Sequence, residues 1–350
     1  LGLADESCLV GDPSREHVEP FMLESPDIET VHYIAGPERY CPDLQVTIDR
    51  QRDYDFVRPI AAALYRRHGL GFRTEDLVRL VTKPRLALFA NGQLGLEGAR
   101  FLRYAGADVA VLVLHPQWSS RYRDEIIEIF DGNIENVIDY TAIESLTPKW
   151  FEKNGIDIIL TLWSSYIFEE ALIEQTPLGI FNLHNSMLPS LGGCGANIWA
   201  ILLDVISGAT LHRVTSVIDR GPIIEQRPLS VDWPDTGGTL FEKQNELMLQ
   251  LLKDRWHDLP IGRYDYLEPV VDPSYFSKSQ RDRKKLIDLD GQYSARDLLN
   301  IIRAYQFGDQ DAAHFKDDMG RIWDVRVSLT RRERNEGESI QHEVSKKHIE

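Results

Sequence analysis

Cysteine is scarce in this chain: Cys8, Cys41 and Cys194 lie far apart, and no C-x-x-C pair occurs. Such spacing argues against a disulfide framework and against a cysteine-based zinc site. No window of about 18 consecutive apolar residues occurs, so the sequence predicts no membrane-spanning helix. The first residues, LGLADESC, lack the basic segment and apolar core of a signal peptide. We therefore expect a reduced, cytoplasmic protein that binds no membrane.

Positive charge is in the minority, because 39 Lys and Arg stand against 55 Asp and Glu, a formal net charge of −16. An acidic surface repels phosphate backbones, so we expect no nucleic-acid partner. The proportions of 43% hydrophobic and 27% charged residues are those of a globular protein. A length of 350 residues predicts two or three domains. No cluster of His, Cys, Asp or Glu has the spacing of metal ligands, and we expect no metal site.

The middle of the chain alternates between continuous apolar segments and segments with helical periodicity. The predicted strands are 85–90, 108–114, 156–162 and 178–184, and the predicted helices between them are 94–103, 123–130 and 169–174. Uninterrupted apolar strands that alternate with helices indicate a parallel sheet covered on both faces. The predicted fold class is therefore α/β, a doubly wound, mainly parallel sheet. Residues 211–215 and 223–231 are predicted to add antiparallel edge strands, followed by a long amphipathic helix over 240–256.

The pattern on either side of this core is less regular. Before it, short strands are predicted at 29–34 and 44–48, and a helix at 53–68 that Gly69 ends. After Pro260 we predict a linker (264–275), a charged turn (281–285), a helix (295–304) and short strands that end near Arg331. The predicted domains are an N-terminal extension (1–82), a core domain (83–258), a smaller C-terminal α+β subdomain (259–332) and a flexible tail (333–350).

Three glycines, Gly92, Gly95 and Gly98, lie where the first core strand turns into its helix. They read G-x-x-G-x-x-G and lack the G-x-G that lets a backbone approach a pyrophosphate. Glycines at such a turn more often serve tight packing. The run 108–114 continues into His115-Pro116 instead of an acidic, ribose-binding residue. An NAD-dependent oxidoreductase on a Rossmann-like scaffold stays open as an alternative.

The densest polar chemistry lies at the carboxyl end of the strand 178–184. Asn182 and His184 are two residues apart and project to the same side of an extended chain. An amide donor beside an imidazole can stabilise an oxyanion and manage a proton. Asp219 follows 35 residues after His184, before a Gly-Pro turn, and a carboxylate could orient that imidazole. A capped strand end and an acidic turn residue are the alternatives.

In these segments the chain resembles the folate-dependent formyltransferases, which include glycinamide ribonucleotide, methionyl-tRNA and sugar N-formyltransferases. The family pattern is Asn-x-His, Ser-x-Leu-Pro, a Val-His segment, and an Asp before a Gly-rich turn and an Ile-Ile strand. Here it reads Asn182-Leu-His184, Ser186-Met-Leu-Pro189, Thr210-Leu-His212 and Asp219-Arg-Gly-Pro-Ile-Ile224. The resemblance covers roughly residues 85–256 and implies a Rossmann-like formyltransferase core.

The resemblance also implies roles for individual residues. Asn182, His184 and Asp219 take the catalytic positions, and the co-substrate is 10-formyltetrahydrofolate, with no metal. The folate would lie against Trp163, Ser164, Ser165, Tyr166, Ile167, Thr215, Ser216 and Ile218. On the substrate side the candidates are Asn91, Gly92, Gly195, Asn197 and Trp199. Trp163 and Tyr166 could equally be ordinary core or rim aromatics.

Several departures from the family pattern favour the sugar N-formyltransferase branch. His184-Asn185 stands where the tRNA and purine branches have His-Pro, and Gly195-Ala-Asn197 with Trp199 resembles the sugar branch. Residues 256–350 hold 16 basic and 18 acidic residues, net −2, whereas a tRNA-binding domain should be basic. The expected acceptor is therefore the amine of an amino sugar, nucleotide-linked or an octulosonic or nonulosonic acid, in surface polysaccharide biosynthesis. The branch implies a homodimer. A methionyl-tRNA formyltransferase-like enzyme and a non-catalytic binding module stay as alternatives.

Residues 1–80 resemble the C-terminal portion of a CMP-sugar cytidylyltransferase. The resemblance rests on the segments 15–20, 44–49 and 53–57. The Gly-Ser-x-Arg nucleotide loop that opens such an enzyme is missing, so we expect no cytidylyl transfer from this chain. The resemblance implies a fused cytidylyltransferase domain in the intact protein. An unrelated extension that packs on the α/β domain is the alternative.

Overall fold

The computed structural model describes residues 36–130, 136–139, 141, 146–269, 272–308 and 311–331. Residues 43–350 form one compact unit, which holds the sheet and the candidate site, and residues 1–42 form another. The described part of the smaller unit contains one short 3-10 helix, η1 (Pro37–Arg39). The predicted strand at 29–34 and the predicted tail at 333–350 lie outside the described residues.

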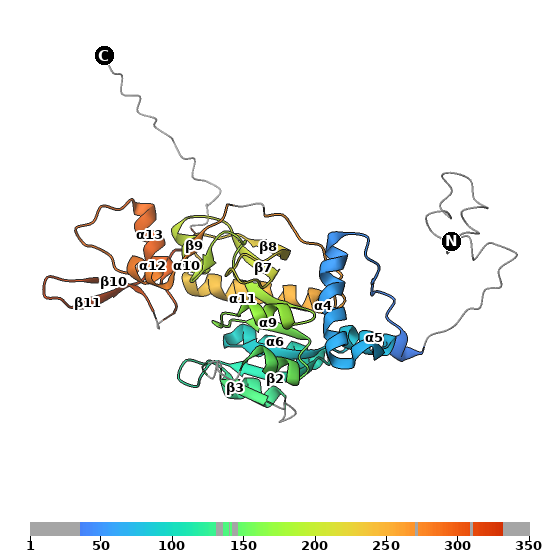
Figure 1. The fold of residues 1–350 in the computed structure, drawn as a ribbon. Helices are drawn as coiled ribbons and strands as arrows, with labels where there is room; N and C mark the ends of the chain where they lie inside the picture. The colour runs from blue at the N-terminus through green and yellow to red at the C-terminus, as the bar shows by residue number, and fades with distance from the viewer. Residues whose placement is uncertain are drawn as a thin grey trace, which may run out of the picture. The chain divides into compact units, whose positions relative to one another are not determined.

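A seven-stranded sheet forms the centre of the larger unit (Figure 1). In spatial order its strands are β3 (Asn136–Asp139), β2 (Asp108–Leu114), β1 (Arg85–Ala90), β4 (Ile158–Leu162), β5 (Ile180–His184), β7 (Ser207–Arg213) and β8 (Ile223–Leu229). The first five are parallel, and β7 and β8 join antiparallel at one edge. The predicted doubly wound, mainly parallel sheet and its antiparallel edge are confirmed.

Helices cover both faces of this sheet, as the continuous apolar strands require. On one face lie α6 (Gly92–Tyr104) and the long α11 (Gly237–Arg255), which packs against α6, β5, β7 and β8. On the other face α8 (Pro148–Lys153) and α9 (Glu170–Gln175) contribute Phe151 and Leu172 to a core cluster with β1, β2, β4 and β5. Helix α7 (Arg123–Ile129) packs on α6. The sheet core is thereby closed to water.

The chain after α11 builds the smaller α+β subdomain. Its elements are β9 (Tyr275–Phe276), α12 (Lys278–Lys284), α13 (Ala295–Ala304) and the hairpin β10 (Ala313–Lys316) with β11 (Ile322–Val325). Helix α13 packs against α10 (Ala196–Leu202), and the Trp199 ring stacks on Phe276 with centroids 4.0 Å apart. Strand β9 pairs with the short β6 (Gly192–Gly193). The subdomain is therefore joined to the loop that follows β5.

Two local predictions are wrong. Residues 44–48 alternate like a strand, yet they pair with no strand in the described part of the chain, and Val46 and Ile48 stay about half exposed. An alternation of apolar and polar residues does not form a strand when no neighbouring strand is there to pair with it. The predicted charged turn at 281–285 lies largely in α12, because Ser277 and Gln280 form a capping box that starts a helix of good helix formers.

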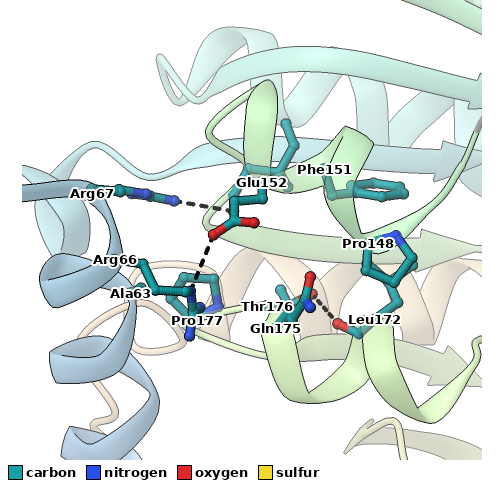
Figure 2. Close-up of a pocket in the computed structure, with 11 residues that line it drawn as sticks. Ala63, Arg66, Arg67, Pro148, Phe151, Glu152, Leu172, Gln175, Thr176 and Pro177 are labelled. Atoms are coloured by element: carbon teal, nitrogen blue, oxygen red, sulfur yellow. Dashed lines mark hydrogen bonds and ion pairs between the residues drawn. The ribbon is translucent and has the colours of Figure 1, made fainter.

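Two helices upstream of the sheet pack onto it through one buried carboxylate. Asp157, fully buried at the start of β4, accepts from Nη1 of Arg67 at 2.6 Å and from the backbone N–H of Arg85 at 2.9 Å. Arg67 belongs to α4 (Gln51–His68), and Arg79 of α5 (Thr74–Thr82) lies 3.8 Å from the same carboxylate. Figure 2 shows α4 facing α8 and the end of α9 across a small cavity, with an Arg66–Glu152 ion pair beside it. Residues 51–82 are thus part of the sheet-containing unit.

We predict that Arg67→Ala lowers the free energy of unfolding by about 2–4 kcal/mol, because it removes the main partner of a fully buried carboxylate. Urea unfolding measures the change. The matched control is Arg66→Ala, which loses only a pair with Glu152 whose two side chains are about two-fifths exposed. Such a pair contributes less than about 1 kcal/mol. Equal losses in the two variants would contradict the role given to Asp157.

Candidate functional site

Three polar side chains lie side by side across the sheet, where β4 and β5 end. The strand register pairs Thr161 of β4 with Asn182 of β5, and Asn182 with His212 of β7. The Thr161 hydroxyl donates to Oδ1 of Asn182 over 2.5 Å, and Nδ2 of Asn182 lies 3.0 Å from Nε2 of His212. Thr161 and His212 are 3% and 2% exposed. Two hydrogen bonds thus hold both ends of the Asn182 amide.

The buried environment of His212 keeps its ring neutral. Burial, and to a smaller extent the neighbouring His184, lower the pKa of His212 from its ordinary 6.5 to about 4. Asp219 and the backbone carbonyl of Arg213 act in the opposite direction but do not outweigh burial. His212 is therefore uncharged over the physiological pH range.

His184 and Asp219, which are 35 residues apart in the sequence, are neighbours in the fold. Nδ1 of His184 lies 3.6 Å from Oδ1 of Asp219, and both side chains are nearly buried, 10% and 13% exposed. Nε2 of His184 lies 3.3 Å from the carbonyl oxygen of Leu191. Asp219 accepts from the Gly193 backbone N–H at 2.7 Å and has a left-handed backbone, φ 54°. Asp and Asn tolerate that conformation better than most residues.

A hydrogen-bond network fixes the loop that follows His184. Thr210 of β7 donates to the carbonyl of Ser186 (2.6 Å) and accepts from the N–H of Leu188 (3.1 Å). Asn185 exchanges two hydrogen bonds with Gln244 of α11: its side-chain amide donates over 2.9 Å, and its backbone carbonyl accepts over 2.8 Å. A proline at this position could still accept with its backbone carbonyl but has no side-chain donor for Gln244. Asn185 thus ties the site to α11.

The residues predicted to line the folate fall into two groups. Trp163 and Tyr166 already have partners: the Trp163 indole donates to Asn245 at 2.6 Å, and the Tyr166 ring packs on Phe89 and Phe168. Burial raises the pKa of Tyr166. Ser164 accepts from the Tyr166 N–H, and the Thr215 hydroxyl donates to the carbonyl of Val217. The remaining members are exposed: Ser165, Ile167, Ser216 and Ile218.

Apolar side chains in these two loops lie open to solvent. Ile167 in the loop after β4 is 66% exposed, and Val217 and Ile218 in the loop between β7 and β8 are 60% and 43% exposed. The same second loop carries Asp219. Exposed apolar groups beside buried polar ones are typical of small-molecule sites.

The residues predicted to bind the substrate lie at two other places, the junction of β1 with α6 and the start of α10. Asn91 and Gly92 lie where β1 ends and α6 begins, and the Asn91 side chain accepts from the N–H of Arg121 at 3.0 Å. Gly195, with φ 80°, precedes α10. Asn197 and Trp199 are buried; the Asn197 amide donates to the carbonyl of Gly237, and Trp199 stacks on Phe276. Both side chains therefore have packing roles, and their contact with a substrate stays a prediction.

Sequence reasoning did not single out Thr161, and it quoted His212 only as part of a motif. Neither lies near Asn182 in the sequence; they meet it through strand pairing. A polar residue at the end of an otherwise apolar strand was the available signal. Its significance depends on a register that a single sequence does not specify.

Other features of the described residues lie apart from this site. The cavity of Figure 2, about 10 Å³ in volume, is lined by α4, α8 and α9 and includes none of the predicted site residues. Within the described ranges, no three His, Cys, Asp or Glu side chains gather closely enough to hold a metal ion. None of the helices described combines the length and apolar character that crossing a membrane demands.

The lowered pKa of His212 predicts a pH dependence of stability. Between pH 6.5 and about 4 the unfolded chain protonates this ring while the folded chain does not, so stability should fall as the pH falls through that window. The contribution amounts to about 3 kcal/mol. Urea unfolding of the wild type and of His212→Gln from pH 7 to 4 measures it. The variant should lose less stability on acidification, and parallel curves would contradict the assignment.

The chain is similar to known proteins both in sequence and in structure. Residues 142–255 match the family model described as formyl transferase, and residues 280–331 match the N-formyltransferase dimerization C-terminal domain. The bifunctional polymyxin resistance protein ArnA of Wigglesworthia glossinidia brevipalpis is 29% identical over 225 residues, which cover 63% of this chain and 34% of that protein. The chain thus spans about a third of the length of this curated relative.

Solved structures share the fold. A sugar N-formyltransferase from Shewanella matches 71% of this chain and 99% of its own, with 16% identity and a TM-score of 0.60. A 4-N formyltransferase from Francisella tularensis matches 71% and 98%, with 19% identity and a TM-score of 0.59. The sugar 3N-formyltransferase WlaRD matches 63% and 78%, with 22% identity and a TM-score of 0.51. The resemblance to the formyltransferases is confirmed for the two segments that match the formyl transferase and N-formyltransferase C-terminal family models, residues 142–255 and 280–331.

Proposed function

We propose that this protein transfers a formyl group from 10-formyltetrahydrofolate to the amine of a nucleotide-linked amino sugar. The observation that carries the proposal is the meeting of His184 and Asp219 beside Asn182, in a segment that matches the formyl transferase family. A base with its orienting carboxylate and an amide donor are the groups that acyl transfer to an amine requires.

The folate, when bound, supplies the formyl group, and this chain's residues handle charge and protons around it. Asn182 would donate an N–H to the carbonyl oxygen that gains negative charge during attack by the amine. His184 lies between two acceptors, Asp219 and the carbonyl of Leu191, so a protonated ring can be held by both. Asp219 would orient that ring and accept the proton that the amine releases. The bond between the formyl carbon and the folate nitrogen would then break, and that nitrogen would leave as the protonated amine of tetrahydrofolate, with His184 as the donor of its proton.

Two observations support a folate beside the loops that follow β4 and β7. The exposed side chains of Ile167, Val217 and Ile218 offer apolar surface to a flat heterocycle, and Asp219 lies in the same loop as the last two. The structure of WlaRD was determined in the presence of dTDP and 5-N-formyl-THF. We propose that Trp163 to Ile167 and Thr215 to Ile218 form the corresponding surface here.

The amino sugar is favoured over the other acceptors by charge and by similarity. The net charge of −2 over residues 256–350 disfavours a tRNA, and the solved structures with this fold include sugar N-formyltransferases. The relative ArnA is named for polymyxin resistance, which is consistent with a sugar of the cell surface. The missing G-x-G after β1 disfavours an NAD-dependent oxidoreductase. A cytoplasmic location and a fused cytidylyltransferase domain stay predictions.

We further propose a homodimer formed through the C-terminal subdomain. Residues 280–331 match a dimerization domain, and the hairpin β10–β11 within them exposes Met319 by 76% and Ile322 by 62%. Exposed apolar side chains close together on one hairpin are typical of an interface. Light scattering of the full chain tests this: a dimer that Ile322→Asp converts to a monomer is expected, and a wild-type monomer would contradict it.

We predict that His184→Ala and Asp219→Asn each reduce kcat by about 10²–10⁴-fold. The affinity for 5-formyltetrahydrofolate should change only a few-fold. Asn tolerates the left-handed backbone of position 219 and can still accept from Gly193, so Asp219→Asn should keep the fold. Tetrahydrofolate release with a panel of nucleotide-linked amino sugars measures the rate. His257→Ala, an exposed histidine outside the site, is the control and should keep wild-type activity. A near-normal rate in either site variant would refute the catalytic assignment.

A further inference from the structure

We propose that His212 and Thr161 are positioning residues that hold the Asn182 amide in one of its two orientations, with one N–H left for the reacting oxygen. The orientation itself follows from hydrogen-bond chemistry in the sheet. Its use in catalysis rests on the proposed formyl transfer.

The carbonyl oxygen of Arg213 decides which nitrogen of His212 carries the proton. Nδ1 of His212 lies 3.1 Å from this oxygen, and a carbonyl can only accept. Nδ1 is therefore the protonated nitrogen. Because the buried ring is neutral at physiological pH, Nε2 has no proton and can only accept.

The tautomer of His212 in turn decides the orientation of Asn182. The amide end that lies 3.0 Å from Nε2 must be the donor end, Nδ2. Reversal of the amide would place its oxygen against the lone pair of Nε2 and leave both without a proton between them. Oδ1 consequently faces Thr161, whose hydroxyl rotates to donate. His212 thus selects the orientation, and Thr161 stabilises it.

This selection matters for an oxyanion site. Asn182 carries two N–H groups, of which His212 takes one. The other is left to donate to the reacting carbonyl oxygen. The reversed amide would present an acceptor to a developing negative charge and repel it. Loss of one such donor typically lowers kcat by about 10²–10³-fold.

The first test reads the tautomer of His212 directly, in the full chain labelled with ¹⁵N-histidine. Long-range ¹H–¹⁵N correlation spectra distinguish the two neutral tautomers and the charged ring, and the His212→Gln spectrum identifies the signal by its absence. We expect the Nδ1–H tautomer at pH 7. The Nε2–H tautomer or a charged ring would overturn the proposal. No substrate is needed, so the result holds whether or not the proposed function does.

The second test is kinetic and compares Thr161→Val with Thr161→Ser. Valine keeps the shape of threonine but cannot donate, so kcat should fall about 10–100-fold while the KM values for folate and amine stay within a few-fold. Serine restores the hydroxyl and should return kcat to within about three-fold of wild type. An unchanged kcat in Thr161→Val, or equal losses in both variants, would overturn the positioning role. If the wild-type chain shows no formyl transfer, the proposed function is refuted. The tautomer of His212 then remains as the test of the Asn182 amide orientation.

Discussion

The structure depends on the register between β4, β5 and β7, because that register brings polar side chains together near the ends of otherwise apolar strands. An isolated amide or imidazole at this depth would cost free energy to desolvate. Thr161, Asn182 and His212 offset that cost for one another, because Thr161 donates a hydrogen bond to Asn182 and Asn182 donates one to His212. A slip of one residue would place these side chains on the opposite face and leave the amide without its partners. The same register therefore determines both the sheet and the site.

The second half of the site comes from loops, and the C-terminal subdomain helps to hold them. Asp219 lies in the loop between β7 and β8 and accepts from Gly193 of β6, which pairs with β9 at the start of the subdomain. The position of the carboxylate relative to His184 is thus linked to the packing of the chain after α11. This arrangement gives the smaller subdomain a part in the geometry of the site besides the dimer contact proposed for it.

The sequence predicted the regular parts of the fold well and the irregular parts poorly, for physical reasons. Continuous apolar strands such as 108–114 indicate a buried parallel sheet directly, and the motif residues around His184 and Asp219 suggested a single site. The predicted strand at 44–48 was wrong because alternation says nothing about a partner strand. The predicted turn at 281–285 was wrong because the capping box at Ser277 outweighed local charge. Thr161 could not be found, since its role exists only through strand pairing.

The most direct test of the account is a calorimetric titration of the full chain with 5-formyltetrahydrofolate, with NADH titrated in parallel. A chain built as described should bind the folate and not the dinucleotide. The bound folate should also stabilise the fold, by about 2.7 kcal/mol at a hundred times its Kd. Binding of NADH without binding of the folate would contradict the central claim, that the loops beside Asn182, His184 and Asp219 form a formyl-donor site.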